Sequence, residues 1–272
     1  PWVQSVSINT GKSSAKHKIY KIGQFINKDL TQIWDVLSKN KISCSIWGAM
    51  NSTFKENNYI NYYFPDPWNF RDKAFPSKLM GLYYLPNYYA KNYLKVNIFK
   101  LIYYSLIFLF RLLLNIKIFS FFKDLIFSIK VFFKKGLKNY ILFFLYDLIF
   151  LNLYSYSFKK NRSSFSLIFL NSIAHYQHNN WNEKSNEKYF FMYAERIFTK
   201  ILELKKECES IIIFNGFTQK KISKEYLLRP HNPEKFLSKF IKYKKLEQDM
   251  TTGGLIFFNN KKEKKASFDI LN

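Results

Sequence analysis

The chain has 272 residues with a formal net charge of +24; 48% of them are hydrophobic and 20% are aromatic. These values allow a buried core and exclude a collagen, a coiled coil and an intrinsically disordered chain. The excess of 43 Lys and Arg over 19 Asp and Glu is typical of proteins that bind nucleic acid or an anionic membrane surface. A/T-rich codons, which favour Lys, Asn, Ile, Phe and Tyr, would produce the same excess, and we expect no nucleic-acid partner.

The two cysteines, Cys44 and Cys208, lie far apart in the sequence, and no Cys-x-x-Cys pair occurs. A zinc ribbon is therefore excluded and a disulfide framework is not expected. We expect a reduced, cytoplasmic compartment, with membrane association left open. The chain begins with Pro1 rather than methionine, which predicts a fragment lacking both ends. For a fragment, the lack of a signal peptide carries no information.

Residues 1–96 mix the signals of helices and strands. In residues 29–37 (DLTQIWDVL), apolar residues recur at positions i, i+3, i+4 and i+7, which predicts a helix. Residues 42–47 (ISCSIW) alternate as a strand does and run into the small-residue turn 48–52 (GAMNS). A helix, a turn, a strand and a loop in this order form half of a parallel α/β unit.

Residues 97–160 are rich in Leu, Ile, Phe and Tyr and contain few acids. Lys100, Tyr104, Arg111 and Asn115 form one polar stripe along a helix, and lysines recur afterwards, so no uninterrupted stretch matches a bilayer. We expect a helical insert outside the sheet, with its Leu and Phe faces packed on one another and its lysines in solvent. A basic amphipathic surface on anionic lipid and a true membrane span stay open as alternatives.

Two later segments are apolar throughout, residues 165–173 (FSLIFLNSI) and 210–214 (SIIIF). Such runs are typical of parallel strands that are buried on both faces, and we expect them as central strands. We therefore predict an α/β fold, a doubly wound mostly parallel sheet with helices on both faces and a helical insert. The expected segments are 1–96 and 161–272, the two parts of the α/β core, and the insert 97–160.

Candidate site residues follow the predicted strands, because ligands bind beyond the carboxyl ends of strands in an open parallel sheet. Asn51 follows the first strand, Asn171, His175 and His178 follow the second, and Asn215 follows the third. Imidazole ligates transition metals and acts as a general acid or base near neutral pH. The plain alternative for the histidine pair is two surface residues at the start of a helix.

Asp66 lies between two prolines in residues 62–68 (YYFPDPW), and the prolines restrict the backbone on both sides. The segment is either a packed turn or an acid held at the rim of a pocket. In a doubly wound chain, Asn51, the two histidines and Asn215 would converge on one cleft, with Asp66 on its rim. The alternative is that these are unrelated loop residues.

Residues 5–17 (SVSINTGKSSAKH) resemble the Thr-Gly…His segment just after the nucleophile in the alkaline-phosphatase-like superfamily, which includes type I phosphodiesterases, nucleotide pyrophosphatases and sulfatases. Residues 173–178 (IAHYQH) stand where the phosphodiesterases carry an Asp-His-x-x-His metal motif, and residues 211–216 (IIIFNG) where they carry a strand ending in Asp-His. With residues 47–51 (WGAMN) and 65–68 (PDPW), these segments look most like a bacterial branch, some of whose members are linked to surface-polysaccharide synthesis.

The resemblance implies a hydrolase or transferase that acts on a phosphodiester, phosphate or sulfate ester in surface-polysaccharide metabolism. It implies a divalent metal, zinc or manganese, at His178 and Asn215, with His175 as a general acid or second donor. Further polar side chains would contact the substrate, an anionic small molecule or glycan: Asn51, Asp66, Thr10 and Asn171.

The chain departs from the family pattern at the metal-binding acids, where it has Ala174 and Asn215-Gly216, and the nucleophile would fall at or before Pro1. Two divalent cations need several anionic oxygens, so the usual dinuclear centre cannot be built in the usual way. The alternative is a catalytically inactive member that binds an anionic glycan or lipid-linked sugar at a membrane surface, with peripheral membrane contact through residues 97–160. Metal content would separate the two hypotheses.

Overall fold

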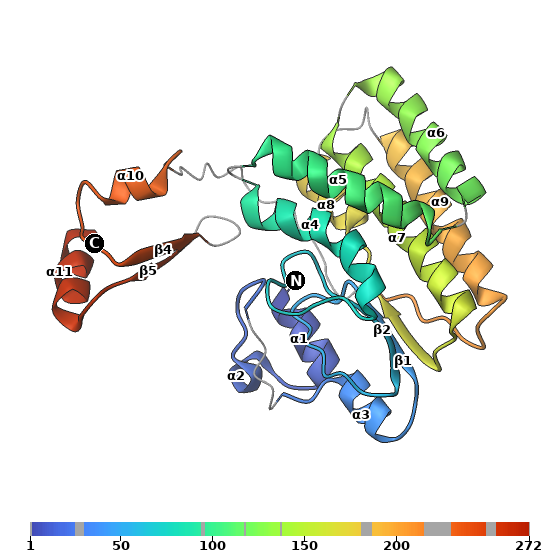
Figure 1. Cartoon of the computed structure of the whole chain (residues 1–272), viewed down its shortest axis with the longest axis horizontal. Helices are drawn as coiled ribbons and strands as arrows, with labels where there is room; N and C mark the ends of the chain where they lie inside the picture. Colours follow the sequence, from blue (N-terminus) through green and yellow to red (C-terminus); the bar gives the residue numbers. More distant parts are fainter. Residues whose placement is uncertain are drawn as a thin grey trace. The chain divides into compact units, whose positions relative to one another are not determined.

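In a computed structural model, the chain forms two compact units, Pro1–Gln219 and Lys220–Asn272 (Figure 1). The division into residues 1–96, 97–160 and 161–272 that we expect from the sequence stays a prediction. The structure describes residues 2–24, 30–93, 96–116, 118–136, 138–180, 187–214, 230–248 and 254–271.

A small parallel sheet lies in the first unit. Its central strand is β1 (Cys44–Trp47), with β2 (Ile60–Phe64) on one side and β3 (Phe165–Ile168) on the other. Both pairings are parallel, and Trp47 stands opposite Phe64 and Ile168. The carboxyl ends of the strands therefore share one edge of the sheet.

The predicted doubly wound sheet is wrong. The described part of the chain has this sheet of three strands and a separate antiparallel pair, and most of the first unit is helical. Residues 165–173 do contain β3, but β3 is a half-exposed edge strand and not a central one. Residues 210–214 form no strand, and the side chains of Ile212, Ile213 and Phe214 are exposed. A continuous apolar run has no period, so it does not distinguish a strand from another apolar segment.

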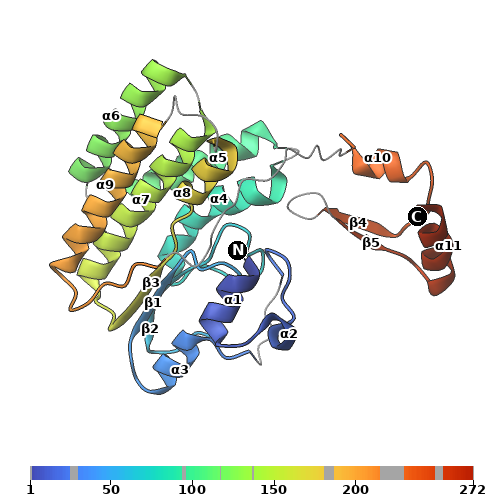
Figure 2. The same ribbon diagram turned by 180° about the vertical axis from the view of Figure 1, so that it is seen from behind.

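Three short helices lie on one side of the sheet: α1 (Trp2–Thr10), α2 (Ser14–His17) and α3 (Ile33–Lys39) (Figure 1, Figure 2). The predicted helix at 29–37 overlaps α3, which starts later than predicted, after a capping box between Gln32 and Asp35. The buried Trp34 of α3 packs with Ile46 and Ile60 of the sheet. The remaining helices of the first unit lie on the other face of the sheet (Figure 2).

The helices on that other side follow β2 and β3 in the chain (Figure 2). The 3-10 turn η1 (Ser77–Leu79) leads into the first of them. They are α4 (Met80–Asn92), α5 (Ile98–Leu113), α6 (Ile118–Lys135), α7 (Asn139–Lys160), α8 (Ser172–Asn180) and α9 (Glu187–Lys205). The expected helices of residues 97–160 are present as α5, α6 and α7, but α7 packs directly on the sheet and does not stand outside it.

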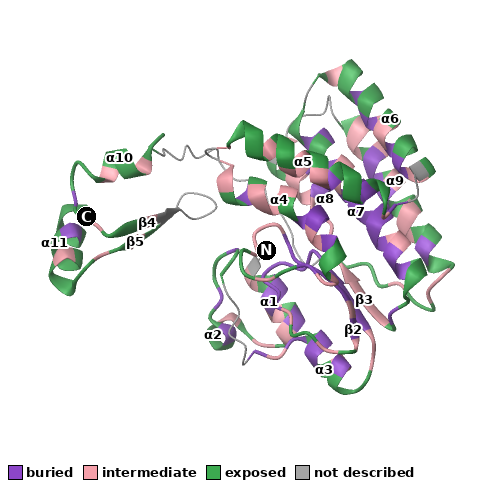
Figure 3. Cartoon of the chain, in the orientation of Figure 1, coloured by how far each residue is buried: buried purple, intermediate pink, exposed green. Residues whose placement is uncertain are grey.

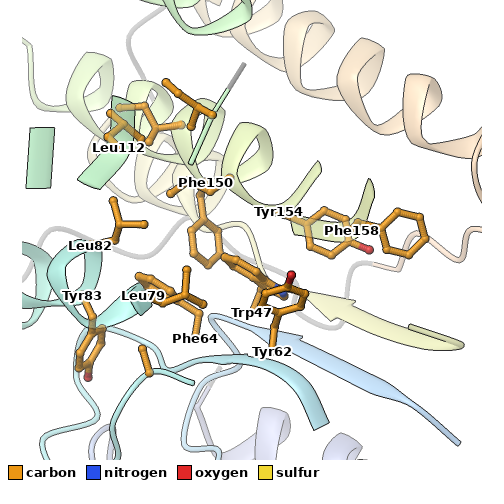
Figure 4. Close-up of a cluster of buried hydrophobic side chains, with 14 of the residues drawn as sticks. Trp47, Tyr62, Phe64, Leu79, Leu82, Tyr83, Leu112, Phe150, Tyr154 and Phe158 are labelled. Atoms are coloured by element: carbon orange, nitrogen blue, oxygen red, sulfur yellow. The ribbon is translucent and has the colours of Figure 1, made fainter. Parts of the chain in front are cut away.

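Two clusters of buried side chains meet in α7. Toward the sheet, Phe150 and Tyr154 pack against Trp47, with ring centroids 5.6 Å and 5.9 Å from the indole (Figure 4). In the second cluster, Phe144 stacks on Tyr193 of α9 with centroids 4.7 Å apart. In the described part of the chain, α7 is the one helix long and apolar enough to cross a membrane, and 67% of its most apolar stretch is buried inside the protein. Burial in the core accounts for its composition.

The second unit contains a short helix, a hairpin and a terminal helix. These elements are α10 (Pro233–Leu237), β4 (Lys245–Gln248), β5 (Gly254–Phe257) and α11 (Lys261–Leu271). The strands β4 and β5 pair antiparallel, with Lys245 opposite Phe257.

The turn after β1 provides a test of this packing. Gly48 and Gly136 both have φ +71°, but a Cβ at Gly48 would lie 3.2 Å from Phe150 Cε1 and 3.3 Å from the Phe169 carbonyl oxygen. A Cβ at Gly136 meets nothing within 4 Å. Both Gly→Ala changes carry the positive-φ penalty of about 1 kcal/mol. We expect G48A to cost a further ~1–2 kcal/mol through crowding. Urea unfolding of both variants measures the difference, and equal losses would contradict the tight packing of α7 on β1.

Candidate functional site

Asn51 follows β1 at the carboxyl edge, with φ +47°, and is buried. Its side chain holds the turn that contains Lys21 and Gly23. The Gly23 N–H donates to Asn51 Oδ1 at 2.7 Å, and Asn51 Nδ2 donates to the Lys21 carbonyl at 2.9 Å. The predicted substrate-binding residue therefore has a structural role, because it fastens one loop over the edge of the sheet.

Asp66 follows β2 at the same edge and is only 3% exposed. The Trp68 N–H donates to its Oδ1 at 2.9 Å, whereas Oδ2 has no hydrogen-bond partner within the described residues. Burial raises the pKa of the Asp66 carboxyl to about 7; the Trp68 N–H opposes the rise and the charge of Asp72 adds to it. Residues 65–67 thus form a packed turn that also holds an acid at a pocket.

A small pocket of about 10 Å³ lies beside Asp66, with room for about one water molecule. Its lining consists of Gly23, Gln24, Asn51, Ser52, Asp66, Asn69, Arg71 and Asp72. Asn69 Nδ2 donates to the Ser52 carbonyl at 3.1 Å and to Asp72 Oδ2 at 3.0 Å. The Tyr63 hydroxyl also donates to Asp72 Oδ2, at 3.1 Å. Several of the polar groups that line this pocket are therefore hydrogen-bonded to other groups of the protein.

The end of β3 is joined to α7 by a buried acid. Asp147 Oδ2 accepts hydrogen bonds from the Ser172 N–H at 2.8 Å and from the Ser172 hydroxyl at 2.6 Å, which caps the start of α8. Burial raises the pKa of the Asp147 carboxyl to about 6, and the hydrogen bonds from Ser172 oppose the rise. Burial and the charges of Asp147 and Asp66 also raise the pKa of the neighbouring Tyr146. Two buried acids thus lie near one tyrosine at the carboxyl edge.

The two predicted histidines lie on α8, outside the lining of the pocket. His175 stacks on Phe143 of α7, with ring centroids 3.7 Å apart and planes 6° apart. Burial lowers the pKa of His175, and the neighbouring His178 lowers it further. His178 is exposed, and Asn171, half-buried, precedes the helix and accepts the His175 backbone N–H at 3.0 Å. The structure therefore brings Asn51 and Asp66 together and places the histidine pair elsewhere.

The N-terminal segment that carried the family resemblance is held by local contacts. Thr10 donates its hydroxyl to the Val6 carbonyl at 2.7 Å within α1. The buried His17 accepts the Ile19 N–H at Nδ1, at 3.0 Å, so its Nε2 carries the proton and donates to Ser7 Oγ at 3.1 Å. Burial lowers the pKa of His17. These residues join α1 to α2.

The predicted metal ligand Asn215 lies outside the described residues. Within the described ranges, no group of three or more His, Cys, Asp and Glu side chains is arranged to hold a metal ion. A zinc or manganese site at His178 therefore stays a prediction.

A different surface stands out on α5 and α6, whose outward sides are largely exposed (Figure 3). Nine apolar side chains on α5 and at its end are 47–79% exposed: Ile98, Phe99, Ile102, Tyr103, Leu106, Leu109, Phe110, Leu113 and Leu114. Six on α6 are 38–86% exposed: Phe119, Phe122, Ile126, Ile129, Phe132 and Phe133. We call these fifteen side chains the α5–α6 surface.

Sequence reasoning expected these side chains to pack on one another and kept an amphipathic surface on anionic lipid only as an alternative. Each helix has apolar residues over more than the one side that it can bury, and this excess was the signal that could have found it. In α5 the buried side is formed by Phe108 and Leu112, and in α6 by Phe121 and Val131. Asp147 was missed, although a lone acid in the apolar segment of α7 marks a group that needs a buried partner.

The raised pKa of Asp66 predicts a pH-dependent stability. The folded carboxyl keeps its proton up to about pH 7, whereas the unfolded one loses it near 3.8. The free energy of unfolding should therefore fall as the pH rises between these values. D66N removes this ionisation, and its stability relative to the parent should improve by on the order of 3 kcal/mol between pH 4 and pH 8.

Urea unfolding followed by tryptophan fluorescence measures this difference, because all five tryptophans lie in the first unit. D269N makes the same chemical change at an exposed acid of the second unit and serves as the control. A gap between D66N and the parent that does not vary with pH would show that Asp66 ionises normally in the fold.

Comparison of the chain with family models, with curated proteins and with solved structures gives no match. The resemblance to the alkaline-phosphatase-like superfamily accordingly stays a prediction from the sequence. Two features of the first unit bear on function: the hydrogen-bonded polar side chains at the edge of the sheet and the α5–α6 surface.

Proposed function

We propose that the chain is a peripheral membrane protein whose first unit binds a lipid bilayer through the α5–α6 surface. The exposure of that surface carries the proposal. Burying one Phe, Leu or Ile side chain is worth about 1.5–3 kcal/mol relative to leaving it exposed. Side chains such as Phe99 and Phe119, 79% and 86% exposed, gain this free energy only if something apolar covers them.

The lengths and contacts of the two helices favour binding in the plane of the membrane. α5 has 16 residues and α6 has 18, and each keeps one side buried against the protein. α5 packs on α4 and α6 packs on α7. A helix that is held to a protein on one side and is apolar on the other can enter the interfacial region of a bilayer without crossing it.

The polar side chains at the edge of the sheet are largely occupied within the protein. The pocket beside Asp66 has room for about one water molecule, and Asn51, Asn69 and Asp72 are used in hydrogen bonds within the protein. A protein that binds an anionic glycan or lipid-linked sugar at a membrane agrees with the α5–α6 surface. Phosphoester hydrolysis stays a prediction of the resemblance.

Exposed substitutions on α5 test membrane binding. Leu106 and Phe110 are each 62% exposed, so L106S combined with F110S should leave the fold intact. The loss of two inserted side chains should weaken binding to vesicles about tenfold or more. The matched control is L202S combined with F191S on α9, where the same residue types are 61% and 59% exposed. Co-sedimentation of the 272-residue chain with vesicles measures both.

We expect the affinity of the α9 double variant for vesicles to stay within about twofold of the parent's, a difference of ~0.4 kcal/mol. Equal losses in both double variants would contradict a specific role of α5. A parent that does not bind vesicles and forms a dimer, with the α5 double variant monomeric, would show that a second copy of the chain covers the surface.

A further inference from the structure

We infer that the α5–α6 surface selects bilayers that contain anionic lipid, with lysines on its border contacting the negative headgroups. This inference rests on the proposed function. It adds the chemical class of the lipid, and the charges of the segment carry it rather than the exposed apolar side chains.

The charge of residues 97–160 is almost entirely positive. The segment contains two acids, Asp124 and Asp147, of the 19 in the chain. It contains ten basic residues: Lys100, Arg111, Lys117, Lys123, Lys130, Lys134, Lys135, Lys138, Lys159 and Lys160. Composition alone does not show whether the two acids are exposed. Their burial therefore decides whether the surface of this segment carries negative charge.

Both acids are removed from the surface. Asp124 is 2% exposed and Asp147 is 4% exposed. Asp124 pairs with Lys200 Nζ at 2.9 Å and Arg196 Nη2 at 3.2 Å, and Asn152 Nδ2 donates to it at 3.0 Å. Asp147 is occupied by Ser172. Neither carboxylate therefore offers negative charge that would repel an anionic headgroup.

Three lysines of α6 lie in one row beside its exposed apolar side chains. Lys123, Lys130 and Lys134 are separated by seven and four residues, which places them on one side of the helix. All three are exposed, and none forms an ion pair within the described part of the chain. At 100° per residue, this row adjoins the arc of Phe119, Ile126 and other exposed apolar residues.

This arrangement fits the interface of a bilayer. The apolar stems of the lysines can lie along the acyl boundary while their ammonium groups reach the headgroups. Each lysine near an anionic surface contributes about 1 kcal/mol to binding, and this contribution is screened by salt. The neutral headgroups of phosphatidylcholine would give little of this gain.

Vesicles of pure phosphatidylcholine and vesicles that also contain phosphatidylglycerol test the inference. We expect the 272-residue chain to bind the mixed vesicles at least about tenfold more tightly, with the difference largely lost near 1 M salt, where the Debye length is about 3 Å. The triple variant K123Q, K130Q, K134Q should lose the preference but keep binding to phosphatidylcholine. The control K39Q, K73Q, K206Q changes three exposed lysines elsewhere in the first unit and should keep the preference.

Each contrary result has a separate meaning. A parent that binds both vesicle types equally would overturn the anionic selection and leave the proposed membrane binding intact. A parent that binds neither would overturn the proposed function itself. Equal losses of the preference in the two triple variants would show that net charge acts without the α6 row, and would overturn the assignment of these lysines.

Discussion

The burial of α7 on two sides is the constraint on which the first unit depends. Its side chains Phe150 and Tyr154 cover the indole of Trp47 on the sheet, and Phe144 packs on Tyr193 of α9. The helix α7 thus fills the space between the sheet and the outer helices. Because that space is taken, α5 and α6 each pack by one side only, and their remaining apolar side chains face outward.

The same helix places the buried acids. Asp147 lies in α7 and caps α8 through Ser172, which joins the helical layer to the end of β3. Asn152, also in α7, donates to Asp124 of α6, whose charge is balanced by Lys200 and Arg196 of α9. Unpaired buried carboxylates are costly, so these contacts are needed for the packing. Their consequence is a surface on α5 and α6 that carries apolar and positive groups without exposed acids.

Part of this structure could be predicted from the sequence. The alternation in residues 42–47 predicted β1, and the spacing in residues 29–37 predicted α3, because both patterns have a defined period. The position of Asp66 between two prolines at a strand end was also readable, and it does line a pocket with Asn51.

The rest depended on contacts that a sequence pattern does not contain. Residues 210–214 are as apolar as a buried strand, but no strand among the described residues pairs with them, and Ile212, Ile213 and Phe214 are exposed. The stacking of His175 on Phe143 follows from the position of α8 on α7. The burial of α7 is an exception, because α7 is apolar on all sides and has basic residues, Lys159 and Lys160, only in its last turn, a pattern typical of a core helix.

An environment-sensitive fluorophore on α5 tests most directly whether α5 enters the bilayer. The label would be attached at Leu106→Cys or, for comparison, at Phe191→Cys on α9, with Cys208→Ser in both. Cys44 can stay, because it is buried and burial raises the pKa of its thiol to about 11, which keeps it unreactive. With anionic vesicles, we predict a blue-shifted, brighter emission from position 106 and an unchanged emission from position 191. Unchanged emission at 106, or equal shifts at both positions, would contradict the insertion of α5 into the membrane.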